Sequence, residues 1–187
     1  NNFVTKKYIN QMIKKDYNSI AFTGILHHHK IENNTAVQIF SKYGPLAFLP
    51  LAETKTSVVY SVDKKFRFNH DDVKKKILEF NKFYKVKKID DLENADLKFY
   101  FSRNCVYKNI LFFGEQMHKI HPLAGQGFNM TIRDIIVLNK LIDEKINCGL
   151  EIDNSLLLDF KNKVQHYNYI FSMGVNLINE FFILDNK

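Results

Sequence analysis

The chain has 187 residues, of which 45% are hydrophobic, and a formal net charge of +7 at pH 7. A chain of this length and composition can bury a core and is expected to form one domain or two small ones. No run of about eighteen apolar residues and no signal-like N-terminus occurs, so we expect a soluble or peripheral protein.

The basic charge and the two cysteines predict no special chemistry. Lysine is spread along the chain and mixed with acidic residues, which favours a solvated surface over a membrane surface and predicts no nucleic-acid partner. Cys105 and Cys148 lie far apart and belong to no C-x-x-C pair, so we expect free thiols without a metal.

The first half of the chain predicts an antiparallel sheet followed by a helix. Residues 1–19 are polar, with a modest helical pattern at Tyr8, Met12 and Ile13. Strand-like segments with turn residues between them cover 20–26, 36–40, 47–51 and 57–62, and the turns are expected at Asn33-Asn34, at Gly44-Pro45 and near Lys55. Residues 71–83 predict a helix with apolar Val73, Ile77, Leu78 and Phe80.

A charged loop over 90–96 is expected to lead to a strand at 98–107 and then to a second, short strand. The apolar run 110–113, ended by Gly114, is typical of a strand buried on both faces. A helix follows whose apolar stripe is expected to face the core, with Arg133 and Asp134 off it. The stripe consists of Phe128, Ile132, Ile135, Ile136, Leu138, Leu141 and Ile142.

A second long helix is predicted at about 154–182, after a helix stop at Gly149. Its apolar seam is expected to cover the fold's own core rather than to form a coiled coil with a partner, and Gly174 within the seam would permit close helix approach. The seam consists of Leu157, Phe160, Val164, Tyr167, Phe171, Gly174, Ile178 and Phe181.

Gly125 and Gly127 stand where the strand-to-helix connection enters the first long helix. Without a Cβ, their backbone can approach a ligand closely, and a helix N-terminus favours phosphate or the reduced anionic flavin ring. Taken alone, the two glycines could equally shape a tight turn. We expect no metal site, because only His27 and His29 of the triplet His27-His28-His29 would share a strand face. His118 and His121 are expected to be loop residues hydrogen-bonded to backbone.

Two segments resemble motifs of the flavin-dependent aromatic hydroxylases, the group A flavoprotein monooxygenases. The nearest branch hydroxylates polyprenyl phenols in ubiquinone biosynthesis. The longer segment matches GD-x-x-H-x-x-HP-x-AGQG-x-N through His118, His121, Pro122, Leu123, Ala124, Gly125, Gln126, Gly127, Asn129 and Arg133-Asp134. The shorter, residues 44–51, resembles the family's G-P-x-A-x-L-P segment.

The resemblance implies the second half of such an enzyme, of mixed α+β and α/β class. It implies a middle, substrate-domain antiparallel sheet over 1–97 with the helix 71–83, and the C-terminal part of a Rossmann-like FAD domain over 98–148 with the flavin motif 114–130. A C-terminal helical segment over 149–187 follows. No three glycines here have the G-x-G-x-x-G spacing of the family's N-terminal dinucleotide-binding βαβ unit.

The resemblance also implies FAD as cofactor, NAD(P)H as reductant and a lipid-tailed phenol as substrate. Flavin contacts are implied for Gly114, Glu115, Pro122, Leu123, Ala124, Gly125, Gln126, Gly127 and Asn129, and the substrate wall for Phe48, Leu49 and Pro50. Glu115 stands where the family has an aspartate that bonds the ribityl chain, and its extra methylene moves the carboxylate by about 1.5 Å. No catalytic acid or base is assigned.

Location and partners follow from the same resemblance. We expect a cytoplasmic protein or one peripheral at the inner membrane, associated with a membrane surface or a ubiquinone-biosynthesis complex, with oligomer contacts through the C-terminal helix. Activity would require a dinucleotide-binding domain from the full gene or another chain, encoded upstream of Asn1 in the first case. The alternatives are a degenerate, non-enzymatic paralogue that binds a lipid or a partner and, less favoured, another member of the superfamily such as a geranylgeranyl reductase.

Overall fold

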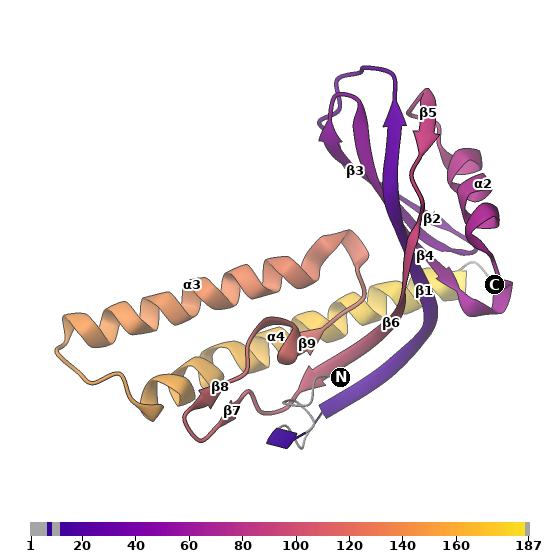
Figure 1. The fold of residues 1–187 in the computed structure, drawn as a ribbon. Helices are drawn as coiled ribbons and strands as arrows, with labels where there is room; N and C mark the ends of the chain where they lie inside the picture. The colour runs from indigo at the N-terminus through magenta and orange to yellow at the C-terminus, as the bar shows by residue number, and fades with distance from the viewer. Residues whose placement is uncertain (1–6, 9–11, 186–187) are drawn as a thin grey trace. The chain divides into compact units, whose positions relative to one another are not determined.

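The computed structural model of the chain describes residues 7–8 and 12–185. The chain divides into two compact units. The sheet unit comprises Asp16–Leu97 with the described residues after Glu180, and the helical unit comprises Lys98–Glu180 with the described residues up to Lys15. Strands β1 (Met12–His28) and β6 (Glu93–Ser102) contribute residues to both units (Figure 1).

The sheet unit contains an antiparallel sheet, as the strand pattern predicted, but its first strand β1 pairs with the fourth strand rather than with the second. The other strands are β2 (Val37–Ser41), β3 (Gly44–Ala52), β4 (Lys55–Asp63) and β5 (Val86–Ile89). The hydrogen-bonded order is β2-β3-β4-β1-β6, continued by β9 of the helical unit, while β5 pairs with one end of β1. Each register from β2 to β1 is antiparallel.

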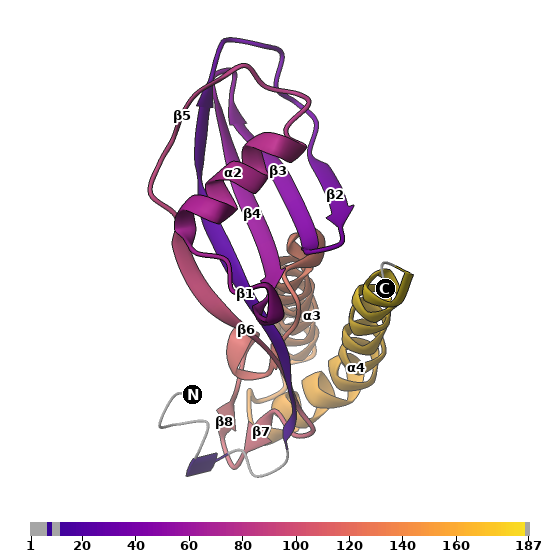
Figure 2. The ribbon, with the colours of Figure 1, turned by 90° about the vertical axis from the view of Figure 1, so that its right-hand side faces the viewer.

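Helix α2 (His70–Phe80) lies across one face of this sheet and follows the short helix η1 (Lys64–Phe66) (Figure 2). A capping box between Asn69 and Asp72 starts α2, and burial of Val73 and Ile77 holds it on the sheet. The helix ends at Phe80 rather than at residue 83. The side chain of Asn81 accepts hydrogen bonds from the next loop's backbone and so competes with another helical turn.

The strand boundaries differ from the predicted ones in three places. Met12 and Ile13 begin β1 instead of a helix, while Tyr8 has helical backbone and residues 1–6 and 9–11 lie outside the described residues. The turn after β2 falls two residues before Gly44, which has a φ of 135°, and a Cβ there would lie 2.0 Å from the Ser61 carbonyl oxygen. Strand β5 ends just before the expected charged loop 90–96, and β6 begins within it. The sequence pattern did not predict these strand residues, because most of their side chains are exposed and the strands form through backbone pairing.

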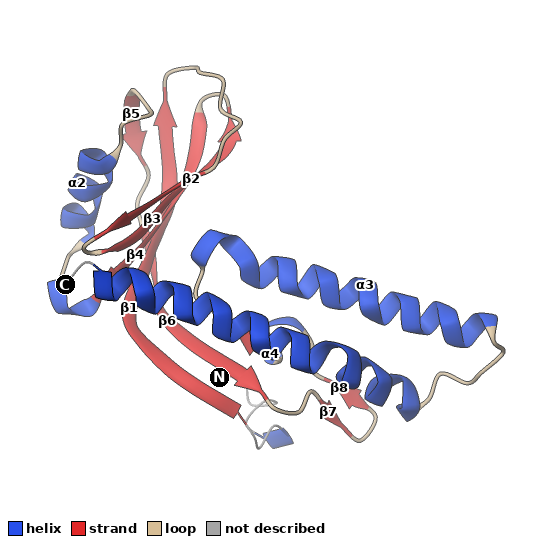
Figure 3. Ribbon diagram, turned by 180° about the vertical axis from the view of Figure 1, so that it is seen from behind, coloured by secondary structure: helices blue, strands red, loops and turns tan. Residues whose placement is uncertain are grey.

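The helical unit contains short strands and turns that lead into two long helices. Its elements are β7 (Val106–Tyr107), β8 (Ile110–Leu111), η2 (Gly114–Gln116), β9 (His118–Lys119), η3 (Leu123–Gly125), α3 (Gln126–Asn147) and α4 (Asn154–Asp185). The two helices lie side by side (Figure 3). Their shared core consists of Cys105, Val106, Met117, Leu141, Leu156, Phe160 and Val164.

Three burial predictions for this unit are wrong. The expected doubly buried strand 110–113 is only the two-residue β8, paired with β7, and Ile110 is 45% exposed. The predicted stripe of α3 is exposed at Phe128, Ile132, Ile135 and Ile136. Its last part packs in the core as predicted, and consists of Leu138, Leu141 and Ile142. Met130 and Asp134, which lie outside the predicted stripe, are also buried.

Helix α4 buries only the first half of its predicted seam. Phe160 and Val164 lie in the core, whereas Tyr167, Ile178 and Phe181 are exposed. No atom lies within 4 Å of a Cβ placed on Gly174, so that glycine does not serve close helix packing among the described residues. From Asn168 onward the buried side chains of α4 are mostly polar, namely Asn168, Ser172 and Asn176 beside Val175, and Asn168 bonds to Arg133 and Asp134 of α3.

Candidate functional site

The segment that carries the longer motif connects β8 to α3 within the helical unit. It passes through η2, β9 and η3 before α3 begins at Gln126. Gly114 and Gly125 have left-handed backbone, with φ of 58° and 66°. Glycine adopts this conformation without the strain that other residues incur, so the two glycines set the direction of the chain at both ends of the loop.

The start of α3 is open and electrostatically positive. Within the described chain no side chain caps this helix, and its first turn holds no acidic residue. The Gln126 N–H donates to the Leu123 carbonyl, and the following N–H groups lie at the positive end of the helix dipole. A Cβ on Gly125 would meet no atom within 4 Å, and one on Gly127 would lie 3.7 Å from Ile120. The loop therefore fits an anionic or hydrogen-bond-accepting group such as the edge of a flavin ring.

Glu115 occupies the short helix η2 at the other end of the loop. Its side chain is exposed, whereas the following Met117 is buried in the core of the unit. Burial, and then the negative charge of Glu115, raise the pKa of Tyr100. The exposed Glu115 carboxylate is open to a ligand.

The two histidines of the loop have different surroundings, and both rings are buried. His118 bonds to a side chain rather than to backbone, contrary to prediction: its Nε2 lies 3.0 Å from Oδ2 of Asp134. Burial lowers the pKa of His121 to about 4, so its imidazole is neutral at neutral pH. The described residues contain no group of three or more side chains that could hold a metal ion.

Asp134 is the centre of a buried polar group that joins the loop to both long helices. The side chain of Asn168 on α4 donates to both carboxylate oxygens of Asp134, at 2.9 and 3.0 Å. Arg133 Nη2 in turn donates to Asn168 Oδ1 at 2.6 Å. The motif marks Arg133-Asp134 in the sequence, but no sequence signal marks Asn168, which lies on another helix.

The predicted substrate residues belong to the sheet unit. Phe48 is fully buried in the core with Leu46 and α2, at 5.8 Å between its ring centroid and that of Tyr84. Leu49 and Pro50 are half-buried. Since alternate residues of a strand face opposite sides of the sheet, Leu49 lies on the face away from α2.

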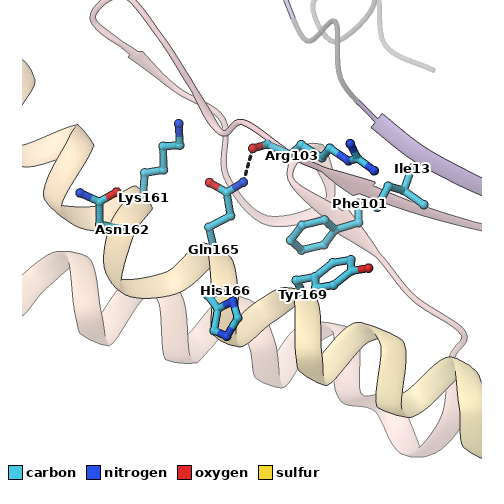
Figure 4. Close-up of a pocket in the computed structure, with 8 residues that line it drawn as sticks. All are labelled: Ile13, Phe101, Arg103, Lys161, Asn162, Gln165, His166 and Tyr169. Carbon is cyan, nitrogen blue, oxygen red and sulfur yellow. Dashed lines mark hydrogen bonds between the residues drawn. The ribbon is translucent and has the colours of Figure 1, made fainter.

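The helical unit also has a cavity of about 430 Å³ between β6 and α4 (Figure 4). Phe101 and Tyr169 form its aromatic side, with ring centroids 5.4 Å apart, and Arg103 and Lys161 add positive charge. Gln165 donates a hydrogen bond to the Arg103 carbonyl. None of the residues predicted to bind cofactor or substrate lines this cavity.

The two cysteines and the membrane prediction remain. Both cysteines are free; Cys105 is buried and Cys148 exposed. Burial raises the pKa of the Cys105 thiol to about 11, so it is no nucleophile at neutral pH. No helix of the described chain is long and apolar enough to cross a membrane.

Comparison with known proteins places these features in a family context. No protein-family model matches the chain. In sequence it is similar to the mitochondrial ubiquinone biosynthesis monooxygenase COQ6 of Danio rerio, at 22% identity over 208 residues, which cover 89% of this chain and 43% of that protein. In structure it is similar to pqsL, a probable FAD-dependent monooxygenase from Pseudomonas aeruginosa, with a TM-score of 0.69, 14% identity and coverage of 91% and 50%. It is also similar to a variant of Klebsiella pneumoniae HpxO complexed with FAD, with a TM-score of 0.74, 9% identity and coverage of 96% and 49%.

These comparisons confirm the resemblance to flavin-dependent hydroxylases and the mixed α and β fold class. The chain spans less than half the length of the COQ6 protein and about half that of each solved structure. Its fold is therefore that of one part of an FAD-dependent monooxygenase.

Proposed function

We propose that this chain is the flavin-ring half of an FAD-dependent monooxygenase that hydroxylates a polyprenylated phenol in ubiquinone biosynthesis. The observation that carries the proposal is the glycine-flanked, uncapped start of α3, in a fold similar to that of FAD-dependent monooxygenases. The substrate class is supported by COQ6 relatives that match along 89% and 90% of the chain.

In this proposal the loop binds and orients the ring side of FAD. The backbone of residues 123–127 would contact the ring edge, and Glu115 would hold the ribityl chain. The helix dipole of α3 would stabilise negative charge on the ring. Bound FAD would supply the hydroxylation, in which two electrons from NAD(P)H are consumed, one oxygen atom of O2 is inserted into the phenol and the other leaves as water.

The sheet unit would provide the apolar wall for the substrate. Leu49, on the face of β3 away from α2, and the half-buried Pro50 would contact the phenol, while Phe48 would support them from the core. An apolar wall excludes water from the reacting ring. The net charge of +7 is compatible with an anionic membrane surface from which a lipid-tailed substrate would come.

The exposed apolar face of α3 indicates where the other half of the enzyme would pack. Phe128 and Ile136 are 71% and 63% exposed, and Ile132 and Ile135 lie between them on the same face. Contiguous exposed apolar residues of this kind mark a protein contact. We propose that the dinucleotide-binding half covers this face and binds the ADP part of FAD.

The test is to purify the chain alone and assembled with the dinucleotide-binding half, from the longer gene or by co-expression. We expect stoichiometric flavin absorbance only in the assembled protein, together with NAD(P)H oxidation that a prenylated phenol stimulates. If the isolated chain is purified with stoichiometric flavin, the proposal that it holds only half of the FAD site is refuted. A colourless assembled protein would favour the non-enzymatic, lipid-binding or partner-binding paralogue.

A further inference from the structure

The buried group around Asp134 joins three different elements of the helical unit. His118 comes from β9, Arg133 and Asp134 from α3, and Asn168 from α4. Asp134 and Asn168 are fully buried, and His118 is 2% exposed. A carboxylate in such a place is costly unless hydrogen bonds and a countercharge compensate for lost water.

The contacts fix the direction of every hydrogen bond. Arg133 can only donate, so the atom of Asn168 that it meets is the amide oxygen, and the amide nitrogen is left to donate to Asp134. The carboxylate of Asp134 accepts, so Nε2 of His118 carries the proton. The guanidinium of Arg133 lies 4.1 Å from the ring centroid of Tyr167. Arg133 thus supplies the countercharge, and Asn168 connects the two charged groups by accepting from Arg133 and donating to Asp134.

The same contacts hold the flavin loop. His118 lies between Gly114 and Gly127, and β9 pairs with β6 through only two residue pairs. The loop therefore has little backbone pairing of its own. Met117 packs in the core with side chains of both long helices, and the bond from His118 to Asp134 adds a directional attachment to α3. Releasing that bond would loosen the segment that carries both Glu115 and Gly125.

We infer that Asp134 is a positioning residue, which fixes the cofactor-binding loop 114–127 by holding the His118 ring, while Asn168 and Arg133 hold the carboxylate. The inference rests on the proposed function for the identity of the ligand. The attachment itself belongs to the protein without cofactor and can be measured there.

Hydrogen exchange of the chain without flavin tests the attachment. In Asp134→Asn one amide hydrogen stays without an acceptor, so we expect exchange in peptides covering 114–127 to quicken on the order of tenfold. The double variant Asp134→Asn, Asn168→Asp exchanges the two groups and allows all the bonds to re-form, so it should restore the wild-type rate. Asp143→Asn, on the exposed side of α3, is the matched control and should change nothing.

The variant Leu141→Ala separates loop release from a general loss of stability, because it removes buried side-chain volume from the same helix. When the two variants are compared under conditions of equal unfolding free energy, hydrogen exchange in loop 114–127 should be slower in Leu141→Ala than in Asp134→Asn. The inference fails if the two variants release the loop equally, if Asp134→Asn exchanges like wild type, or if the double variant does not recover.

FAD titration of the assembled protein then separates this inference from the proposed function. We expect Asp134→Asn to weaken FAD binding about tenfold and the double variant to restore it. Wild-type assembled protein that binds no FAD would refute the proposed function and leave the loop attachment supported by hydrogen exchange. Loop release without any loss of FAD affinity would refute the positioning role.

Discussion

Replacing Gly125 by alanine tests whether the open space at the start of α3 serves a ligand. Gly125 has a φ of 66°, and Gly149, beyond the other end of the same helix, has a φ of 64°; neither has an atom within 4 Å of a built Cβ. Left-handed backbone costs an alanine about 1–2 kcal/mol, and the reduced entropy of the unfolded chain offsets about 0.4–1 kcal/mol of this. Each variant should therefore lose about 1 kcal/mol of unfolding free energy, without a clash.

Urea unfolding of the two variants measures this shared conformational cost. FAD titration of the assembled protein, followed by flavin fluorescence, then measures what differs. We expect Gly125→Ala to weaken FAD binding at least about tenfold, because its Cβ occupies the approach to the α3 N–H groups, and Gly149→Ala to leave it within about twofold. Equal FAD affinities would refute the assignment of the loop to the flavin ring. Unequal stability losses would refute the conformational argument.

Burial lowers the pKa of His121 to about 4, whereas the pKa of a histidine in an unfolded chain is about 6.5. The unfolded state therefore binds the proton first as the pH drops. The unfolding free energy should fall by up to about 3 kcal/mol between about pH 6.5 and about pH 4. His121→Gln should flatten this dependence in urea titrations at pH 7 and 4.5, and an unchanged slope would contradict the assignment. Ile136→Asp, on the exposed face of α3, should change the stability of the isolated chain by less than about 0.5 kcal/mol and prevent co-purification with the dinucleotide-binding half; retained assembly would show that this face is not the contact. Phe160→Ala should cost about 3–5 kcal/mol, because Phe160 is fully buried, whereas Leu177→Ala, exposed on the same helix, should cost almost nothing; similar losses in thermal unfolding would contradict the burial described for α4.

The sheet could be predicted because its signals are local. The alternation in β3 and β4 follows from side chains that face α2 or the opposite side of the sheet. The start of β6 could not be predicted in this way. Its first four residues are exposed, so hydrogen bonding to β1, rather than apolar side chains, extends the strand.

The candidate site was predicted only as far as it is continuous in the sequence. The glycine loop forms one segment, and its pattern of glycines before a helix has a direct physical meaning. Asn168 lies 34 residues from Asp134, and an asparagine within a helix usually predicts an exposed side chain. Its burial depends on the packing of α3 against α4, which no local pattern specifies.

The wrong burial predictions nearest the loop have a common cause under the proposed function. The apolar pattern correctly identifies buried positions where this chain supplies the neighbour, as for Phe48 under α2 or Phe160 beside β8 and α3. It fails at Ile110 and along the face of α3 that contains Ile136, which lie on either side of the glycine loop. A buried-type pattern on an exposed surface is what a contact with another part of the enzyme requires. Under the proposed function, the same contact would also account for the expectation that the isolated chain does not hold FAD firmly. Binding of the ADP half would then depend on residues that pack against these two segments.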